Sequence, residues 1–536
     1  MIKQNNDLST KFMQGAFLLT ISSIIIKLLS AAYRVPYQNI VGDVGFYIYQ
    51  QVYPLYALAL VLSTYGFPVI ISKLLAEMNE GNRQYTRVEI VVSSWVSLTL
   101  ISAFAFSALF FGAEIWSGMM NDPMLEKSIK MISLSFLFLP FLSVLKGIFQ
   151  SDGEMVPTAV AQVVEQTVRV GFILLASWIF YYYGLSLYKV AEWAFAGSVI
   201  GSAISVLILV VYYRRKRNRK DIIIDSVKIR QNLLPLSGKI LGQGIIFSIS
   251  SLILVFIQFM DAFVLYPLLT ESGMEMINAK QWKGVYDRGQ PLLHVGTAAT
   301  IALSLTIVPL ISKYKQQNDR QNVRRYTELS FRLSLMMGMA ATVGLALIIK
   351  PVNIMLFTDA RGSKSLAVLS ISILFCSLLM TGMSILQSLG HSLISVGIIA
   401  VGLLVKFALM LVLIPKLSIM GAALSTTTAF IVMACLLFGF LRKIFRRPVI
   451  KRQTWLLVLF ASLGMSAAII MEDQLFSAAN HYLSANRLII GFQVLFTVCT
   501  GAIVYMVTII RMGMFTLDEL TLLPFGSKLA KFLPRK

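Results

Sequence analysis

Long apolar stretches alternate with short polar segments along the whole chain. A helix needs about 20 residues to cross about 30 Å of hydrocarbon, and fourteen stretches are that long. Each is predicted to be a helix, because an open strand edge is not tolerated in lipid. The pattern therefore predicts an all-α integral membrane protein. The predicted spans lie near 12–34, 46–72, 88–112, 129–149, 157–183, 190–213, 239–269, 289–312, 329–349, 366–389, 393–414, 419–441, 453–471 and 488–510.

Three short motifs occur twice in the same order, the second copy 228 to 240 residues after the first. The pairs are 14–23 (QGAFLLTISS) with 243–251 (QGIIFSISS), 68–73 (PVIISK) with 309–313 (PLISK), and 150–153 (QSDG) with 387–390 (QSLG). A duplicated helix bundle is typical of transporters that open alternately to two sides of a membrane. We predict two pseudo-symmetric six-helix lobes, residues 1–234 and 235–445. Residues 446–536 carry two further helices and a tail.

Composition agrees with a membrane protein, with 57% hydrophobic and 13% charged residues among 536 and a mean hydropathy of +0.76. The net charge of +22 comes largely from segments beside the spans, such as the basic run 214–220. Such runs contact anionic lipid headgroups, so we do not expect nucleic-acid binding. If both termini are placed in the cytoplasm, the segments on the cytoplasmic side carry about three times as many lysines and arginines as the outer loops. The first span contains Lys27 and no small-residue cleavage site, so we expect it to stay as a helix of a multi-pass protein.

The chain carries no phosphate-binding loop and no His-Glu-x-x-His motif. Its three histidines have no metal-ligand neighbours at helical spacing, and its outer acids are scattered. The cysteines Cys376, Cys435 and Cys499 all lie in apolar spans. We therefore expect neither an enzyme nor a metal site nor a cofactor.

Ionisable residues deep in the membrane are costly and are candidates for function. This set comprises Lys27, Lys146, Glu165, Arg169, Asp261 and Lys406, with Arg34 and Arg288 nearer the ends of their spans. The repeat makes Arg169 and Lys406 equivalent, so the two cations are candidates to converge on one anion. Alternatively, Glu165 and Arg169 pair on one helix face at i, i+4 spacing. Lys406 has no acid in its own helix.

The repeat also places Arg34 and Asp261 at similar depths toward the outer face with opposite charge. We expect them either to pair as an outer gate or to leave Arg34 extending to the interface. Lys27 has no acid one turn away, and it needs water, a backbone carbonyl or a substrate anion. His294 is either a proton shuttle or a hydrogen-bonded structural residue. Asp261, Glu165, Arg169 and His294 are the candidates for a gate or for ion coupling.

The helix count and three motifs resemble those of the multidrug/oligosaccharidyl-lipid/polysaccharide exporter superfamily. The motifs are 30–36 (SAAYRVP), 288–292 (RGQPL) and 309–313 (PLISK). Within it, the chain is similar to stage V sporulation protein B-like and lipid II flippase-like proteins. The resemblance implies a V-shaped pair of lobes around a central cavity. It also implies transport of a polyprenyl-diphosphate-linked sugar from the inner to the outer leaflet of the cell membrane, for cell-wall, spore-cortex or polysaccharide synthesis.

In such flippases, cavity cations hold the diphosphate. The matching positions here are Lys27, Arg34 and Arg288, to which the repeat adds Lys406. Partners are then the lipid-linked glycan and membrane lipids, with cell-wall synthesis enzymes as candidates. The membrane potential, H⁺ or Na⁺ are the candidate driving forces. The alternative is a cation-coupled multidrug antiporter of the same superfamily, but a cationic drug calls for acids where Lys27 and Lys406 stand.

Overall fold

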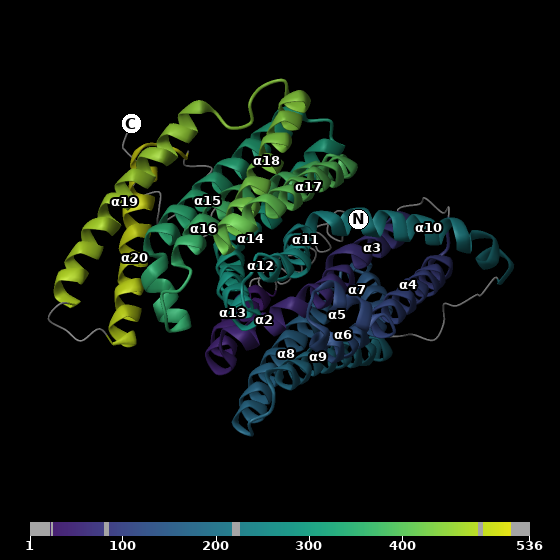
Figure 1. Cartoon of the computed structure of the whole chain (residues 1–536). Helices are drawn as coiled ribbons and strands as arrows, with labels where there is room; N and C mark the ends of the chain where they lie inside the picture. The colour runs from purple at the N-terminus through teal and green to yellow at the C-terminus, as the bar shows by residue number, and fades with distance from the viewer. Residues whose placement is uncertain (1–21, 23–24, 80–84, 217–225, 481–485, 516–536) are drawn as a thin grey trace. The chain divides into compact units, whose positions relative to one another are not determined.

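A computed structural model describes the chain except residues 1–21, 23–24, 80–84, 217–225, 481–485 and 516–536. The start of the predicted span 12–34 and most of the basic run 214–220 thus lie outside the described residues. All regular elements in the described part are helices (Figure 1). Thirteen of its segments are long and apolar enough to cross a membrane. The predicted all-α, multi-span class is confirmed.

The first two predicted spans form one continuous segment, Ile25–Met78, which the backbone breaks twice. Helix α2 (Arg34–Val61) is interrupted at Gly42, whose φ of 68° is readily available only to glycine. A π-helical turn, Leu62–Gly66, follows and leads into α3 (Phe67–Asn79). Pro68 has no N–H for a bond to the preceding turn, and a wider turn before it relieves the ring clash.

The predicted single span 239–269 is wrong in detail, because the chain divides there into several pieces. Helix α10 (Ser226–Ser251) ends before Leu252, and α11 (Ile253–Met260) begins directly after that residue. A second π-helical turn, Asp261–Leu265, leads into α12 (Tyr266–Glu271). Pro267 stands at the start of α12, as Pro68 does near the start of α3. Hydropathy cannot detect these breaks, because every piece is apolar.

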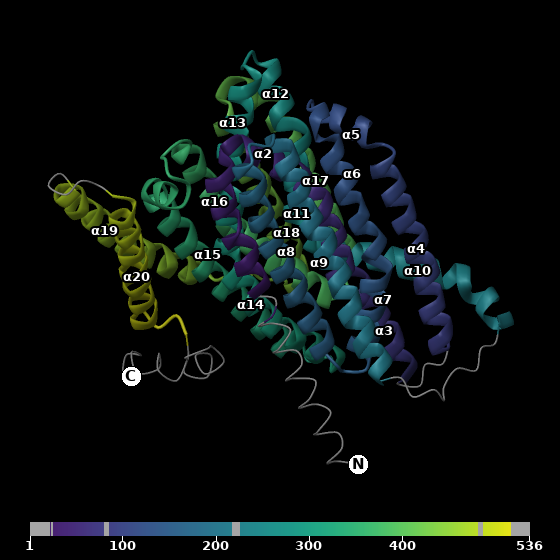
Figure 2. The same ribbon diagram turned by 90° about the horizontal axis from the view of Figure 1, so that it is seen from below.

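By contacts, the chain forms two compact units, the first comprising Met1–Asp287 and His391–Leu403. Besides α2, α3 and α10–α12, unit 1 holds α4 (Arg87–Phe110), α5 (Ala113–Met119), α6 (Glu126–Ser133), α7 (Leu139–Ser151), α8 (Val156–Tyr182), α9 (Leu187–Lys216) and α13 (Met276–Asp287). In Figure 2, α5, α12 and α13 lie at one end of this unit. Helix α10 belongs to it by packing on α3 and α4, where Asn232 donates to Glu89 at 2.9 Å.

Unit 2 comprises Arg288–Gly390 and Leu404–Lys536. It holds α14 (Gly289–Gln316), α15 (Arg320–Phe357), α16 (Ser363–Ser388), α18 (Ile419–Phe445), α19 (Arg452–Asn480) and α20 (Arg487–Arg511), while α17 (Ser392–Leu417) is shared between the units. Helices α19 and α20 pack on each other and on α15. The predicted lobe boundaries near 234 and 445 describe the sequence duplication and stay a prediction.

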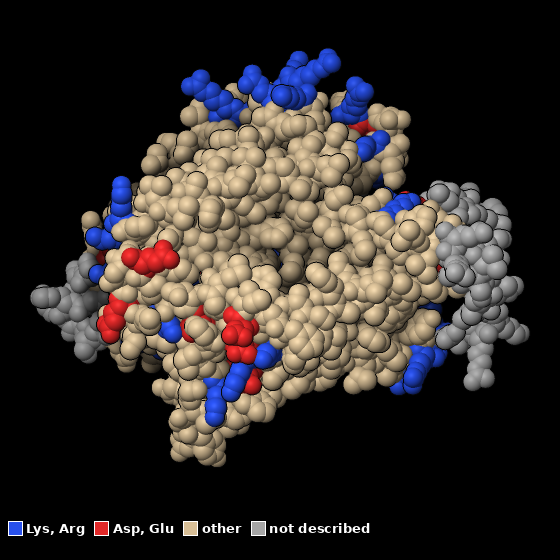
Figure 3. Space-filling view, turned by 45° about the vertical axis from the view of Figure 1, so that its right-hand side comes forward, with Lys and Arg blue, Asp and Glu red and all other residues tan. Residues whose placement is uncertain are grey.

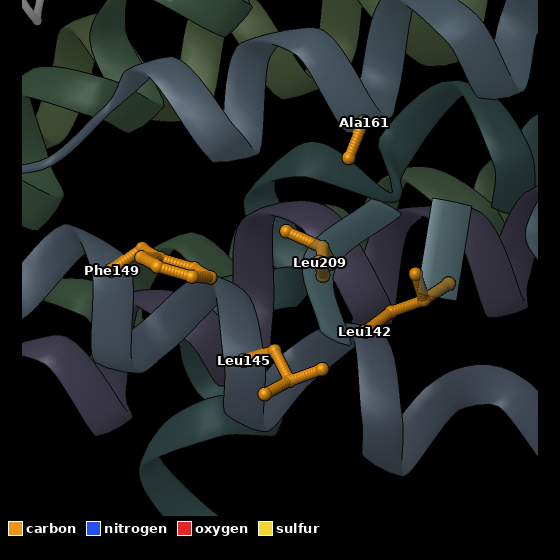
Figure 4. Close-up of a cluster of buried hydrophobic side chains, with 5 residues drawn as sticks. All are labelled: Leu142, Leu145, Phe149, Ala161 and Leu209. Atoms are coloured by element: carbon orange, nitrogen blue, oxygen red, sulfur yellow. The ribbon is translucent and has the colours of Figure 1, made fainter. Parts of the chain in front are cut away.

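Apolar and small residues hold the helices of unit 1 together. Figure 4 shows a buried cluster of Leu142, Leu145 and Phe149 from α7 with Ala161 from α8 and Leu209 from α9. Beside it, Gly197 and Gly201 of α9 face the backbone of α8 at Glu165–Arg169, where an added Cβ would lie within 3.3 Å of a carbonyl oxygen. A small-residue face of this kind lets two membrane helices approach closely. On the face in Figure 3, charged side chains lie mostly at the margins of a broad uncharged surface, as expected for a surface in contact with lipid.

Candidate functional site

Arg34 is the most unusual buried group of unit 1. It starts α2, is 1% exposed, and has its guanidinium carbon 4.5 Å from the centroid of the Tyr53 ring. Its three side-chain nitrogens have no hydrogen-bond partner among the described residues. A buried guanidinium without such partners carries a large desolvation penalty. Arg34 is therefore a candidate for binding an acceptor from outside unit 1.

Arg169 lies in the same aromatic environment but is well supplied with partners. Its Nη2 donates to the Tyr33 hydroxyl at 3.0 Å and its Nη1 to Gln166 Oε1 at 3.1 Å. The guanidinium carbon lies 4.5 Å from the centroid of the Tyr56 ring, a cation–π distance. Arg169 thus reaches Tyr33, the residue that precedes Arg34, and connects α8 to the start of α2.

The predicted i, i+4 ion pair between Glu165 and Arg169 is not formed among the described residues. Glu165 instead accepts a hydrogen bond from Ser202 of α9 at 3.1 Å and is 3% exposed. On α7, Lys146 is fully buried, and its Nζ has no hydrogen-bond partner in the described part of the chain. Helices α2, α7 and α8 of unit 1 therefore bury three cations, Arg34, Lys146 and Arg169. Glu165 of α8 is buried as well.

Asp261 lies in the π-helical turn and is 1% exposed. The Tyr286 hydroxyl donates to its Oδ2 at 3.4 Å. The predicted pairing of Asp261 with Arg34 as an outer gate stays a prediction. π-Helical turns frequently occur at functional sites, which keeps Asp261 a candidate.

Helix α13 carries a buried ion pair of its own. Lys283 Nζ lies 2.6 Å from Asp287 Oδ2, and both side chains are almost fully buried. Burial raises the pKa of Asp287 to about 6, although Lys283 acts in the opposite direction. The backbone of α13 approaches that of α2 closely, since a Cβ on Gly284 would overlap the Asp43 carbonyl group.

In unit 2, Arg288 is committed to an ion pair. It is fully buried at the start of α14 and binds Asp359 through both nitrogens, Nη1–Oδ1 at 2.7 Å and Nη2–Oδ2 at 2.9 Å. Burial alone would raise the Asp359 pKa, but the hydrogen bonds from Arg288 and from the Arg361 N–H hold that pKa below its ordinary value. The pair holds the loop in which Thr358 and Gly362 adopt left-handed backbone conformations. A role for Arg288 in substrate binding stays a prediction.

The other predicted site residues lie on three further helices. Lys27 is partly exposed in the helical residues 25–32, Lys406 is fully buried in α17, and His294 is partly buried in α14. Each of these three residues already interacts with another group of the protein. Their assignment to one binding site therefore stays a prediction.

One cluster escaped the sequence analysis. Asp122, between α5 and α6, is 2% exposed and accepts hydrogen bonds from the hydroxyls of Tyr47 at 3.1 Å and Tyr188 at 2.7 Å. Lys280 of α13 lies 3.0 Å from the same carboxylate and within 6 Å of the centroids of the Tyr47, Tyr188 and Tyr266 rings. These residues come from distant parts of the chain, and no sequence spacing connects them.

The fold and the buried cations together define a multi-pass α-helical membrane protein. Residues 12–315 of this chain match a protein family whose description is "Polysaccharide biosynthesis protein". The chain belongs to this family, within the exporter superfamily that its motifs indicated.

Three proteins of Bacillus subtilis (strain 168) are similar along most of their length. The uncharacterized membrane protein YabM is 38% identical over 526 residues, covering 98% of this chain and 97% of that protein. Stage V sporulation protein B is 28% identical over 435 residues, covering 79% and 82%. Lipid II flippase MurJ is 25% identical over 492 residues, covering 86% and 89%.

Solved structures share the fold at low sequence identity. The inward closed conformation of lipid II flippase MurJ has a TM-score of 0.68 at 15% identity and covers 92% of this chain and 98% of that chain. An inward-facing multidrug resistance MATE family transporter of the MOP superfamily has a TM-score of 0.61 at 13% identity, covering 80% and 98%. At these identities the likeness establishes the fold alone.

Proposed function

We propose that this protein is a flippase that moves a polyprenyl-diphosphate-linked sugar or peptidoglycan precursor from the inner to the outer leaflet by alternating access. The observation that carries the proposal is Arg34, a buried guanidinium without a hydrogen-bond partner among the described residues. A diphosphate supplies what this group lacks, because guanidinium binds phosphate oxygens through short, charge-assisted hydrogen bonds. Membership of a polysaccharide biosynthesis family and similarity to a lipid II flippase support the same substrate class.

In this proposal Arg34 binds the diphosphate, and Lys27 of the same unit contributes positive charge. Lysine suits the role as a point charge, whereas arginine binds through a planar fork. The apolar polyprenyl chain stays in the hydrocarbon, so only the charged headgroup and the sugar must pass through the protein. Transport needs no covalent step, in keeping with a non-enzymatic role.

The orientation follows from the distribution of basic residues. We infer that the protein resides in the cell membrane with both termini in the cytoplasm, since the segments then facing inward carry the excess of lysine and arginine. In this orientation α5, α12 and α13 face the outside. Single cysteines placed in the loop 446–451 or in α13 and labelled with an impermeant thiol reagent in intact cells test the assignment. Labelling at 446–451 and not in α13 would refute it.

The function is tested by complementation in a bacterium depleted of its lipid II flippase. The wild-type chain and Arg34→Gln are expressed beside Arg214→Gln, which changes an exposed arginine of the same unit. Rescue by the wild type and by the control, with loss in Arg34→Gln at equal membrane abundance, is expected. If the wild type fails to rescue, binding of a polyprenyl diphosphate to the purified protein tests the substrate class directly. Absence of binding would refute the proposal.

A further inference from the structure

Two buried arginines of unit 1 lie against the same aromatic ring. The guanidinium carbon of Arg34 is 4.5 Å from the centroid of the Tyr53 ring, and that of Arg169 is 5.7 Å from the same centroid. Because both distances share one end, the two guanidinium carbons are at most about 10 Å apart. Both side chains are almost fully buried. The fold of unit 1 therefore brings together a cation from α2 and a cation from α8.

The groups that bond Arg169 do not neutralise its charge. Its Nη2 donates to the Tyr33 hydroxyl and its Nη1 to the amide oxygen of Gln166, and both acceptors are neutral. Glu165, one turn earlier on α8, accepts a hydrogen bond from a serine of α9 instead. Like charges repel each other strongly in a buried environment, and an anion between them removes this repulsion. The arrangement of Arg34 and Arg169 therefore favours an anion that contacts both.

Hydrogen-bond donors remain available on both arginines. A guanidinium has five N–H groups. All three side-chain nitrogens of Arg34 and the Nε of Arg169 are buried without a hydrogen-bond partner among the described residues. Arg169 can therefore keep its bonds to Tyr33 and Gln166 and still donate from Nε to a ligand. The hydroxyl of Tyr37, one turn after Arg34, is also buried without a partner in the part of the chain that the structure describes.

Packed aromatic side chains hold the two arginines in place. The Tyr33 hydroxyl, which accepts a hydrogen bond from Arg169, lies 2.9 Å from the Tyr49 hydroxyl. The Tyr49 ring stacks on Phe195 of α9 with 4.8 Å between the ring centroids, and its centroid lies 6.0 Å from that of Tyr53. Side chains that are positioned before a ligand arrives reduce the entropy cost of binding. The separation of the two guanidiniums is thus set by the fold.

We propose that Arg34 and Arg169 bind the two phosphates of one diphosphate, so that the protein selects lipid carriers with a diphosphate over carriers with a single phosphate. This inference rests on the proposed function and adds Arg169 to it as a specificity-determining residue. A diphosphate has oxygens on two phosphorus atoms, so it can accept charge-assisted hydrogen bonds of about 2.8 Å from both guanidiniums. A single phosphate at Arg34 leaves the Nε of Arg169 without an acceptor, and an unpaired buried donor is costly.

The separation of the arginines favours a long anion. A carboxylate carries both of its oxygens on one carbon atom and fits a single guanidinium as a fork. Two linked phosphates are longer and reach both guanidiniums, whether the phosphates belong to a lipid headgroup or to inorganic diphosphate. Because both arginines are buried in this conformation, the ligand reaches them only when the protein opens, as alternating access requires.

Selectivity is measured by isothermal titration calorimetry on the purified full chain in detergent. The probes are polyprenyl diphosphate, polyprenyl monophosphate and inorganic diphosphate. We expect the wild type to bind polyprenyl diphosphate at least about tenfold more tightly than polyprenyl monophosphate, because the second arginine adds a hydrogen bond between charged groups. Arg34→Gln weakens the binding of both lipids. Arg214→Gln, which changes an exposed arginine of the same unit, is the matched control and behaves as the wild type.

Changes at Arg169 separate direct binding from a structural role. Arg169→Gln lowers the affinity for polyprenyl diphosphate about tenfold and leaves the affinity for polyprenyl monophosphate almost unchanged. A structural role alone would weaken the binding of both lipids alike, and that result overturns the inference. Thermal unfolding shows whether each variant folds. If Arg169→Gln does not, Arg169→Lys decides: lysine keeps the charge without the planar fork, so the preference for diphosphate falls severalfold, and an unchanged preference overturns the inference.

The three probes also separate this inference from the flippase proposal. If the wild type binds polyprenyl diphosphate and polyprenyl monophosphate equally well, the two-arginine site is overturned and the flippase proposal stands. If the wild type binds neither lipid, the flippase proposal is refuted, and inorganic diphosphate then tests the two-arginine site alone. Binding of inorganic diphosphate that is weakened by both Arg34→Gln and Arg169→Gln supports the site, and absence of such binding overturns it.

Discussion

Replacing Lys280 by methionine should release α13 from the rest of unit 1. Lys280 lies 3.0 Å from the buried carboxylate of Asp122 and donates to the Tyr188 hydroxyl at 2.6 Å. It also sits against three tyrosine rings. Methionine retains most of the apolar length of the side chain and removes the charge. The substitution therefore tests the electrostatic contribution of this attachment.

The expected effect follows from what remains after the change. Removing one partner of a buried ion pair costs about 3–5 kcal/mol, because the other charge stays buried and unpaired. Asp122 retains hydrogen bonds from Tyr47 and Tyr188, and the Lys280 side chain is 16% exposed, so we expect the lower end of this range. A loss of about 3 kcal/mol makes local opening roughly a hundredfold more frequent.

Hydrogen–deuterium exchange of residues 276–287 in the purified protein measures this opening. Lys127→Met, which changes an exposed lysine of the same unit, is the control and should leave the exchange unchanged. In a double-mutant cycle, Lys280→Met and Asp122→Asn should be non-additive by about 1–3 kcal/mol. If Lys280→Met accelerates exchange no more than the control does, or if the two changes are additive, the attachment does not hold α13 in place.

Three further predictions concern stability in detergent solution. Asp359→Asn lowers the thermal stability at neutral pH. Because the pKa of Asp359 is depressed in the folded state, the difference in thermal stability between variant and wild type persists down to about pH 4. The difference then disappears as the pH falls through the folded-state pKa. A difference that stays constant to pH 2 would contradict this assignment. Gly201→Ala destabilises by about 1–3 kcal/mol, because its Cβ would lie 2.8 Å from the Glu165 carbonyl oxygen, whereas Gly171→Ala, with open space around it, does not. Leu209→Ala lowers the free energy of unfolding by about 2–5 kcal/mol in an unfolding titration, because Leu209 belongs to the buried cluster. Leu207→Ala, at a side chain that is 62% exposed, lowers it much less. Equal losses of unfolding free energy in the two variants would contradict the assignment of Leu209 to the core.

The sequence predicted the helical class and most spans correctly. A run of about 20 apolar residues has one stable structure in lipid, the helix, because its own backbone satisfies every hydrogen bond. The breaks within the spans escaped this reasoning. Prolines 68 and 267 were visible, but whether a proline kinks a helix, widens a turn or ends the helix depends on the packing around it.

The candidate site, too, was predictable from the sequence only in part. Depth in an apolar span correctly selected Lys146, Glu165, Arg169, Asp261 and Lys406 as buried residues. Arg34 and Arg288, which the sequence placed nearer the ends of their spans, are buried as well. Their partners were not predictable, and the i, i+4 pair of Glu165 and Arg169 illustrates why. Helical spacing makes that pair available, but Ser202 and Tyr33 on neighbouring helices offered better-placed partners.

By itself, then, the sequence determined that this protein is a multi-span helical membrane protein with an excess of buried cations. Those properties depend on hydropathy and charge, which can be added up residue by residue without knowledge of the tertiary structure. Only the tertiary structure decided which charges are paired. It joined Lys280 to Asp122 and Arg288 to Asp359, and it left Arg34 and Lys146 without hydrogen-bond partners among the described residues. The physical reason is that the energy of a buried charge depends on contacts within a few ångströms, and helix packing alone brings such distant residues together.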